Sequence, residues 1–259
     1  MISESDIAPN FNLTGKVALI TGAGRGIGRA CALACAASGA DIVLGVRDVV
    51  AAAELIAEIE SLGRQVLPVK LDISRRTDVD ASVVAAIARF GRIDILINNV
   101  GIAPENPAED VTEKDFDLIL EVNLKDTFFM TQAVARTMIE RKSGRIINIS
   151  SQAGTITLHG ESIYCMSKAA INHLTRCLAA EWARYGITVN TVAPTFIWTD
   201  ATRPSLDKPD FYRRTLAHIP LGRIGDTNDV IGAVVFLASP ASALITGTNL
   251  LVDGGWSVA

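Results

Sequence analysis

Three side chains that could together move a proton stand within one stretch of the sequence, Ser151 to Lys168. Tyr164 and Lys168 are four residues apart, so on a helix they would share one face. Ser151 precedes Tyr164 by thirteen residues, across a loop that can fold it back onto that face. A phenol, an ammonium group and a hydroxyl that meet in space make a site for proton transfer at a substrate oxygen.

The charge of Lys168 would lower the pKa of the Tyr164 phenol. The pKa of a free tyrosine is about 10, and a lysine cation about 5 Å away contributes roughly 3 kcal/mol at an effective dielectric constant near 20. We therefore expect Lys168 to lower the pKa of Tyr164 towards the range useful for acid–base catalysis. The four-residue spacing alone is weak support, because many surface helices carry it by chance.

The composition is that of a globular protein with a substantial core. Of 259 residues, 49% are hydrophobic and 20% are charged, and the net charge is −4. No basic block occurs, which argues against nucleic-acid binding. The four cysteines have no metal-type spacing, so we expect small buried residues in a reducing cytosol and no metal site. They are Cys31, Cys35, Cys165 and Cys177.

Two features of the sequence argue against a membrane protein. Residues 1–16 are polar and acidic, unlike a signal peptide. The longest apolar run, Val230–Ala238, is too short to span a bilayer. We therefore expect a cytoplasmic protein without a membrane partner.

A glycine-rich turn follows the first predicted strand, Lys16–Thr21, and precedes an alanine-rich helix, Arg29–Ser38. Glycines let a backbone approach a pyrophosphate, and the helix N-terminus offers unpaired N–H groups. The spacing is TGxxxGxG rather than GxGxxG, and a merely tight connection remains an alternative. The turn comprises Gly22, Ala23, Gly24, Arg25, Gly26, Ile27 and Gly28.

The second predicted strand, Asp41–Val46, is followed directly by Arg47. In such folds the residues after this strand reach the adenosine ribose, where an acidic side chain would repel a 2′-phosphate. No acid stands at Val46, and Arg25 can point to the same region as Arg47. Two guanidinium groups suit a 2′-phosphate, so NADP(H) is preferred here and NAD(H) stays possible. Both arginines could instead be surface charges, and Asp48 could occupy Arg47.

The remaining elements continue the alternation of strand and helix. This pattern predicts βαβ units, hence an α/β fold: a doubly wound, Rossmann-like parallel sheet with helices on both faces. No linker separates two domains, so residues 1–259 are expected to form one. The further strands are 65–71, 93–97, 145–150, 187–193 and 248–252, and the further helices are 49–62, 76–89, 116–141, 162–185 and 226–238.

The segments whose residues could bind a ligand or take part in catalysis all follow predicted strands. Right-handed crossovers bring the carboxyl ends of parallel strands to one edge, where open α/β sheets bind ligands. Residues 195–217 lack clear periodicity and are predicted to be a substrate loop. The segments that follow strands are 22–28, Arg47, Asp72, 98–101 and 150–151.

In combination these residues resemble the short-chain dehydrogenase/reductase family in its single-domain form, over Thr14–Val258. The motifs are TGAGRGIG at Thr21–Gly28, LDI at Leu71–Ile73, NNVG at Asn98–Gly101, Asn123, ISS ending at Ser151, and YCMSK at Tyr164–Lys168.

The resemblance implies a sheet of order 3-2-1-4-5-6-7 and a nicotinamide dinucleotide cofactor. It implies that Tyr164 exchanges a proton with the substrate oxygen, that Ser151 hydrogen-bonds this oxygen, that Lys168 holds the nicotinamide ribose, and that Asn123 supports a water relay. Further cofactor contacts would come from Asp72, Ile73, Asn98, Gly101, Pro194, Ile197 and Thr199, besides the glycine turn.

Two positions depart from the family pattern. Val100 stands where alanine is usual, and Thr195 stands where glycine usually follows the proline. Thr195 puts in doubt only the local backbone and the shape of the nicotinamide-side pocket. The pair Arg25 and Arg47 resembles the branch of the family that prefers NADP.

Polar residues near the expected substrate pocket favour a sugar, polyol, sugar acid or small oxo acid, although His159 and Glu161 could instead face solvent or another subunit. A 3-oxoacyl-thioester reductase is the alternative within the family, and a non-catalytic dinucleotide sensor is the alternative of another class. Resemblance also implies a homotetramer, paired through the two long helices and the apolar C-terminal tail. The predicted substrate residues are Gln152, His159, Glu161, Phe196 and Trp198.

Overall fold

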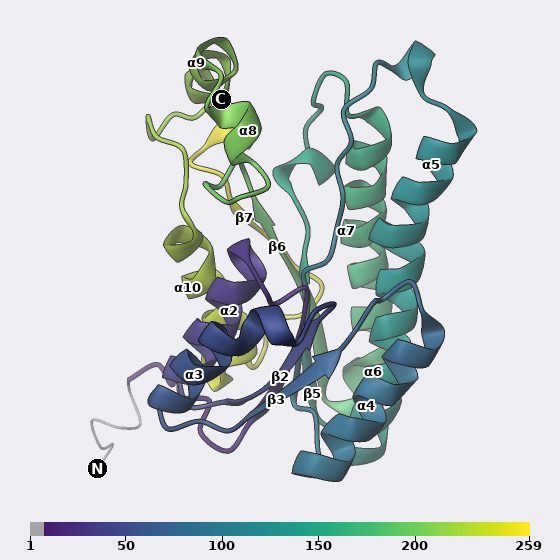
Figure 1. The fold of residues 1–259 in the computed structure, drawn as a ribbon, viewed down its shortest axis with the longest axis vertical. Coiled ribbons are helices and arrows are strands. Elements are labelled where there is room, and N and C mark those ends of the chain that lie inside the picture. Colours follow the sequence, from purple (N-terminus) through teal and green to yellow (C-terminus); the bar gives the residue numbers. More distant parts are fainter. Residues whose placement is uncertain (1–7) are drawn as a thin grey trace.

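A seven-stranded parallel sheet forms the centre of the structure, a computed structural model that describes residues 8–259 (Figure 1). The strand order β3-β2-β1-β4-β5-β6-β7 confirms the predicted topology. The N-terminal segment discussed above lies partly outside the described residues. The strands are β1 (Val17–Thr21), β2 (Asp41–Val46), β3 (Val66–Lys70), β4 (Ile95–Asn98), β5 (Gly144–Ile149), β6 (Ile187–Pro194) and β7 (Asn249–Val252).

Helices cover both faces of the sheet, because each βαβ crossover must return along one face (Figure 1). One face carries α2 (Gly26–Ala37), α3 (Ala53–Ser61) and α10 (Thr227–Ala238). The other carries α4 (Arg76–Phe90), α6 (Thr127–Arg141) and α7 (Ser162–Trp182). None of the helices within residues 8–259 is long and apolar enough to cross a membrane.

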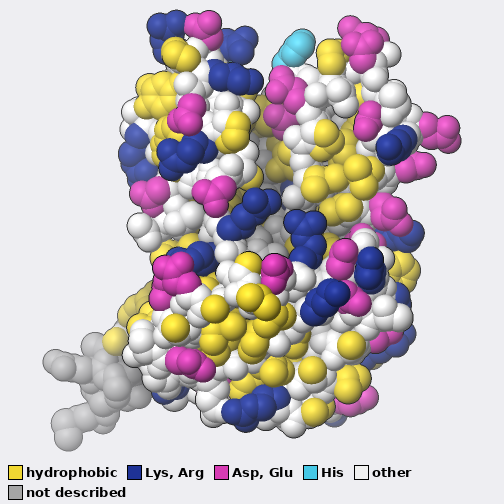
Figure 2. Space-filling model, viewed as in Figure 1, with side chains coloured by type: hydrophobic (Ala, Val, Ile, Leu, Met, Phe, Trp, Pro, Cys, Tyr) yellow, Lys and Arg dark blue, Asp and Glu magenta, His cyan; other side chains and the backbone are white. Residues whose placement is uncertain are grey.

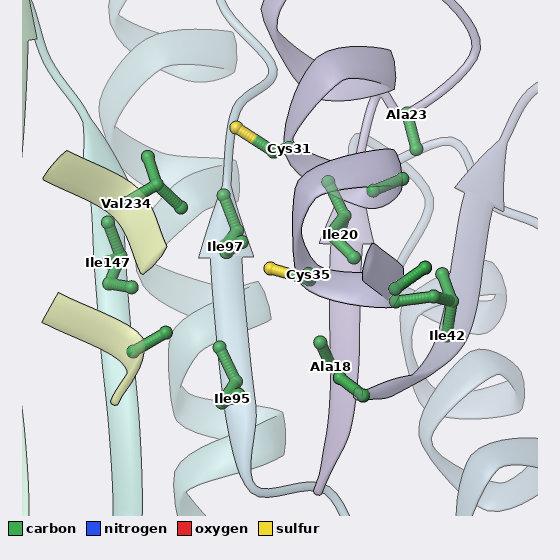
Figure 3. Close-up of a cluster of buried hydrophobic side chains, with 14 of the residues drawn as sticks. Ala18, Ile20, Ala23, Cys31, Cys35, Ile42, Ile95, Ile97, Ile147 and Val234 are labelled. Atoms are coloured by element: carbon green, nitrogen blue, oxygen red, sulfur yellow. The ribbon is translucent and has the colours of Figure 1, made fainter. Parts of the chain in front are cut away.

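The core between α2 and the sheet shows why the strands read as continuous apolar runs. Ile20 and Ile97 are fully buried beneath α2, which contributes Cys31 and Cys35 to the same cluster (Figure 3). Burial raises the pKa of the Cys31 thiol, and raises that of Cys35 to about 12, so both act as small apolar residues. The expectation of buried cysteines is wrong for Cys177, which is exposed.

The predicted helix 116–141 is three elements in the structure. It begins as α5 (Glu113–Leu120), where the Thr112 hydroxyl accepts a hydrogen bond from the Asp115 backbone N–H at 3.1 Å, as the sequence pattern indicated. A π-helical segment, η3 (Glu121–Asp126), then interrupts the α-helical pattern before α6. Such widened turns expose backbone groups and recur at functional sites. Apolar periodicity tolerates one wide turn, so the sequence did not reveal it.

The predicted substrate loop 195–217 is not structureless. It contains two short helices, α8 (Arg203–Leu206) and α9 (Pro209–Ala217), each with a proline in its first turn. They stand above the carboxyl ends of the strands, together with the C-terminus (Figure 1). A small separate core holds them: Leu206, Ile219 and Ile224, with Phe196, Trp198, Phe211, Tyr212 and Trp256 packed around them.

Candidate active site

The loops at the carboxyl ends of the strands border a hollow between two lobes (Figure 2). One lobe carries α8 and α9, and the other carries α5 and the start of α7 (Figure 1). Lysine and arginine side chains gather at the base of this hollow, where the lobes meet the sheet layer (Figure 2). The loops that follow the strands therefore border one concave surface.

Tyr164 and Lys168 stand one turn apart on α7, and the ammonium nitrogen lies 5.6 Å from the centroid of the tyrosine ring. Ser151 follows β5 and is buried. Its hydroxyl accepts a bond from the Ala153 N–H at 3.1 Å, which orients it, and its interaction with Tyr164 lowers the pKa of the phenol. The structure thus brings together the three side chains on which the sequence argument began.

For the protein chain alone, the prediction that the pKa of Tyr164 is lowered is wrong. Burial raises the pKa of Tyr164 to about 12, the Ser151 hydrogen bond opposes this, and the nearby Glu161 charge adds to it. The Lys168 charge is not among the causes of this shift, and burial lowers the pKa of Lys168 itself to about 8. At neutral pH the phenol therefore carries its proton and can act as a donor.

Lys168 is held against two other elements. Its Nζ donates to the Ile149 carbonyl at 3.1 Å. A Cβ atom added at Gly101 would stand 3.3 Å from this nitrogen and 3.4 Å from the Asn123 Oδ1. A side chain here would crowd both groups, and the contacts bring Gly101 to the catalytic side of the site.

Asn123 lies within the π-helical segment and clamps the loop after β4. Its Oδ1 accepts from the Ile102 N–H at 2.8 Å, and its Nδ2 donates to the Ile102 carbonyl at 2.9 Å and to the Ser167 hydroxyl at 3.0 Å. Both N–H donors of the side chain are thus committed to positioning α7 and this loop.

Asn98 has a different role from the one expected. Its side chain lies in the interior, where Nδ2 donates to Thr131 Oγ1 and to Asn148 Oδ1, both at 2.8 Å. Asn148 in turn donates to Thr175 at 2.9 Å. This buried network ties β4 and β5 to α6 and α7, so the Asn98 side chain is not a cofactor contact. The sequence argument missed Asn148, although a polar residue in an apolar strand could have signalled it.

The glycine turn is shaped for close backbone approach. A Cβ atom at Gly28 would lie 2.4 Å from the Gly22 carbonyl oxygen and 2.5 Å from Asn99 Nδ2, so no side chain fits there. Gly26 has a φ of +54°, and a Cβ atom added there would lie 3.4 Å from the Thr199 side chain, which places the loop after β6 above the N-terminus of α2. These residues fit a pyrophosphate at the helix N-terminus with the nicotinamide end towards Thr199.

Asn99 was not among the predicted site residues, yet it links the turn to β4. Its Nδ2 lies 3.2 Å from the carbonyl oxygens of both Thr21 and Gly22, and its backbone N–H donates to Thr21 Oγ1 at 3.0 Å. The asparagine pair after β4 was visible in the sequence, but only the structure shows that the second member holds the turn.

The two candidate phosphate-binding arginines stand free in the described part of the chain. Arg25 and Arg47 are exposed, and neither forms an ion pair within residues 8–259. Asp48, a possible competitor, instead accepts bonds from the backbone N–H groups of Val50 and Ala51. The Arg47 charge contributes to lowering the pKa of Asp72, after bonds from Ser74, so Arg47 lies towards the end of β3.

Loop packing brings the two arginine-bearing segments together. The Ala23 N–H donates to the Gly45 carbonyl at 3.1 Å, and a Cβ atom at Gly24 would lie 3.6 Å from Val46. Among the other predicted cofactor residues, Ile73 and Ile197 are buried, and Pro194 ends β6. Thr195 fits without a positive φ, so the departure from glycine causes no backbone strain.

The predicted substrate residues fall into three groups. Glu161 is half-buried beside Tyr164, whereas His159 is exposed. Gln152 is buried, and its Oε1 has no hydrogen-bond partner among the described residues. Phe196 stacks on Trp256 at 5.8 Å and Trp198 stacks on Tyr212 at 6.3 Å, so both aromatic rings are largely committed to the small core under α8 and α9.

Comparison with known proteins gives consistent matches over nearly the whole chain. Residues 22–257 match a family model described as enoyl-(acyl carrier protein) reductase. The chain is 39% identical to a D-threitol dehydrogenase of Mycolicibacterium smegmatis, over 98% of each chain. It is 40% identical to a 3-oxoacyl-[acyl-carrier-protein] reductase of Synechocystis, over 94% of this chain and 97% of the relative.

Among solved structures, the fold is similar to that of a gluconate 5-dehydrogenase from Burkholderia cenocepacia in complex with NADP and tartrate. The TM-score is 0.93 at 38% sequence identity, over 97% of this chain and 98% of the other.

Proposed function

Because the chain belongs to the short-chain dehydrogenase/reductase family of oxidoreductases, we propose that it transfers a hydride between NADP(H) and a small polar carbonyl or secondary alcohol. The observation that carries this proposal is the position of the Lys168 ammonium, 5.6 Å from the centroid of the Tyr164 ring, with Ser151 close enough to lower the pKa of the phenol. A carbonyl oxygen held between the two hydroxyls would receive a proton as its carbon receives a hydride.

Each side chain has one task in this mechanism. The protonated Tyr164 donates to the substrate oxygen in reduction and accepts the proton in oxidation, while Ser151 hydrogen-bonds the same oxygen. Lys168 presents a cation beneath the phenol and towards the nicotinamide ribose, and Asn123 fixes the loop that closes this side. The dinucleotide supplies or accepts the hydride when bound. The protein holds and orients the dinucleotide and the substrate, and polarises the substrate oxygen.

The substrate class follows from the relatives and from the polar character of the site. Relatives are named for threitol, gluconate and 2-dehydro-3-deoxygluconate, so a sugar, polyol or sugar acid is the proposed substrate. The similarity to 3-oxoacyl-[acyl-carrier-protein] reductases makes a thioester substrate the second candidate. A non-catalytic sensor is disfavoured, because Ser151, Tyr164, Lys168 and Asn123 are all present and brought together.

A panel of substrates would test the proposal. The purified protein would be assayed at 340 nm with NADPH against uncharged ketoses, oxo sugar acids and acetoacetyl thioesters, and with NADP⁺ against the matching alcohols. Turnover of a sugar-type substrate, lost in Y164F, is the expected result. Turnover of the thioester alone would support the second candidate. If no substrate of the panel is turned over although NADPH binds tightly, the non-catalytic dinucleotide sensor would be favoured instead.

We further propose that the protein is a single-domain cytoplasmic enzyme that assembles as a homotetramer. An apolar groove of about 360 Å³ runs between α6 and α7, lined in part by Phe128, Leu174 and Trp182. A second copy of the same two helices would cover it. A monomeric mass by light scattering at micromolar concentration would contradict the assembly, and Leu174→Glu should weaken it.

A further inference from the structure

Two acidic side chains meet at the edge of the active site. Glu161 is the residue before α7 and lies three positions from Tyr164. Glu105 comes from the loop after β4, and its Cγ and Oε1 would lie 3.1 Å and 3.5 Å from a Cβ atom added at Gly160. Because Gly160 has a φ of +76° and no side chain, the two loops can pack this closely.

This arrangement is held by the backbone. The Asn106 N–H donates to the Gly160 carbonyl at 2.8 Å, and the Glu161 N–H donates to the Leu158 carbonyl at 3.3 Å. The Glu161 carbonyl accepts from the Cys165 N–H at 2.8 Å, so the residue is fixed to the first turn of α7. Hydrogen bonds therefore hold the two acid-bearing loops together.

The charge of Glu161 affects the pKa of the reacting phenol, Tyr164. Glu161 is the first charged neighbour that raises the pKa of Tyr164, and it also raises the pKa of Cys165. Burial, followed by repulsion from Glu105, raises the pKa of Glu161 to about 7. Above that pH the Glu161 carboxylate is ionised three residues before Tyr164, and Glu105 adds a second negative charge beside Glu161.

On the opposite lobe, Arg203 of α8 forms no ion pair with either carboxylate within the described residues. The Arg203 guanidinium of α8 lies over the Trp198 ring at 5.4 Å, and its side chain is exposed. Figure 1 shows α8 across the hollow from α5 and the start of α7. A substrate carboxylate on the Glu161 side would be repelled, whereas hydroxyl groups could donate hydrogen bonds to a carboxylate.

We propose that Glu161, assisted by Glu105, is a specificity-determining residue that selects uncharged polyols and ketoses over sugar acids. This inference rests on the proposed function, since it concerns the substrate of the same site. Glu161 would accept hydrogen bonds from hydroxyl groups next to the reacting carbon. Glu105 would keep this edge of the site negative.

The test compares substrates that differ only in charge. D-Glucitol and D-gluconate share their carbon skeleton but end in a hydroxymethyl group or a carboxylate, as do D-threitol and D-threonate. Rates of NADP⁺ reduction would be measured at pH 8.5, where Glu161 is ionised, for wild type, Glu161→Gln, Glu105→Gln and Glu109→Gln. Glu109 is an exposed acid farther along the same segment and serves as the matched control.

We expect wild type to have at least tenfold higher kcat/KM for the uncharged member of a pair. Glu161→Gln should reduce this ratio fivefold or more by raising kcat/KM for the acid, Glu105→Gln should reduce it less, and Glu109→Gln should leave it unchanged. A wild-type preference for the acid, as an Arg203 contact would produce, would overturn the inference. So would an unchanged ratio in Glu161→Gln.

Ligand binding separates failure of this inference from failure of the proposed function. The shift in Tm of the NADP⁺ complex would be recorded with each of the four ligands. If no pair is turned over, yet the uncharged ligands stabilise wild type and the acids stabilise only Glu161→Gln, the charge selection holds while the proposed function falls. If neither class of ligand shifts the Tm of any variant, the inference falls.

Discussion

Replacement of Arg47 by alanine tests the cofactor assignment most directly. The side chain is exposed, follows β2, and forms no ion pair within residues 8–259. Asp48, the adjacent acid, is occupied by the Val50 and Ala51 N–H groups. The substitution therefore removes a charge without removing a structural contact, and the fold should be unaffected.

The magnitude follows from the exposure of the site. A charge-assisted hydrogen bond contributes about 1.5–3 kcal/mol. Solvent screening and the nearby Asp72 carboxylate place Arg47 at the lower end, about 1.5–2 kcal/mol. Since about 1.4 kcal/mol is tenfold in affinity, the Kd for NADPH should rise roughly 10- to 30-fold. The Kd for NADH, which lacks the 2′-phosphate, should stay the same.

The assay is titration of nucleotide fluorescence with wild type, Arg47→Ala, Arg25→Ala and the double variant. Arg89→Ala is the control, because Arg89 is also exposed but lies in the last turn of α4, bonded to Gln65. The loss in Arg47→Ala should shrink as salt rises, because exposed charges are screened. Equal losses for NADPH and NADH, or a wild-type preference for NADH, would refute the reasoning.

Four further variants test the site and the core. Tyr164→Phe should abolish turnover and leave the Kd for NADPH nearly unchanged, since only the proton is lost; an active variant would contradict the mechanism. Lys168→Ala should reduce both turnover and dinucleotide affinity, measured by the same titration. Gly28→Ala should abolish NADPH binding or destabilise the fold, because its Cβ would lie 2.4 Å from a carbonyl oxygen. Burial raises the pKa of Asp126 to about 6, above the unfolded value of about 3.9, so its ionisation costs stability as pH rises from about 4 to 6. Asp126→Asn should therefore raise the free energy of unfolding at pH 7.5, by about 2 kcal/mol after a discount for solvent screening, and raise it little at pH 4, by urea denaturation; equal gains at both pH values would exclude the charge as the cause.

The topology could be read from the chain because a parallel sheet leaves strong local signals. Strands buried on both faces must be continuously apolar, and each must be followed by a helix that returns along one face. The strand Asp41–Val46 was predicted with its observed bounds. The order of all seven strands is the one that the family resemblance implied. Strand ends then placed the glycine turn, Arg47 and Ser151 at one edge.

Features that depend on packing between distant segments were not predicted. The π-helical turn at Asn123 is set by bonds to Ile102 and Ser167, which no local pattern reveals. The helices within residues 195–217 are held by Trp256, from the far end of the chain. The inward direction of the Asn98 side chain depends on Thr131 and Asn148, its partners across the sheet and α6.

The sequence by itself determined the residue types that meet at the site and the edge at which they meet. These depend on spacing along a helix and on the direction of strands, which are local properties. Only the tertiary structure decided the electrostatics. Burial sets the pKa of Tyr164 above its ordinary value and that of Lys168 below it, and packing of two loops brings Glu105 to Glu161. Solvation and through-space charge depend on everything that surrounds a group, and the order of residues along a chain does not contain that directly.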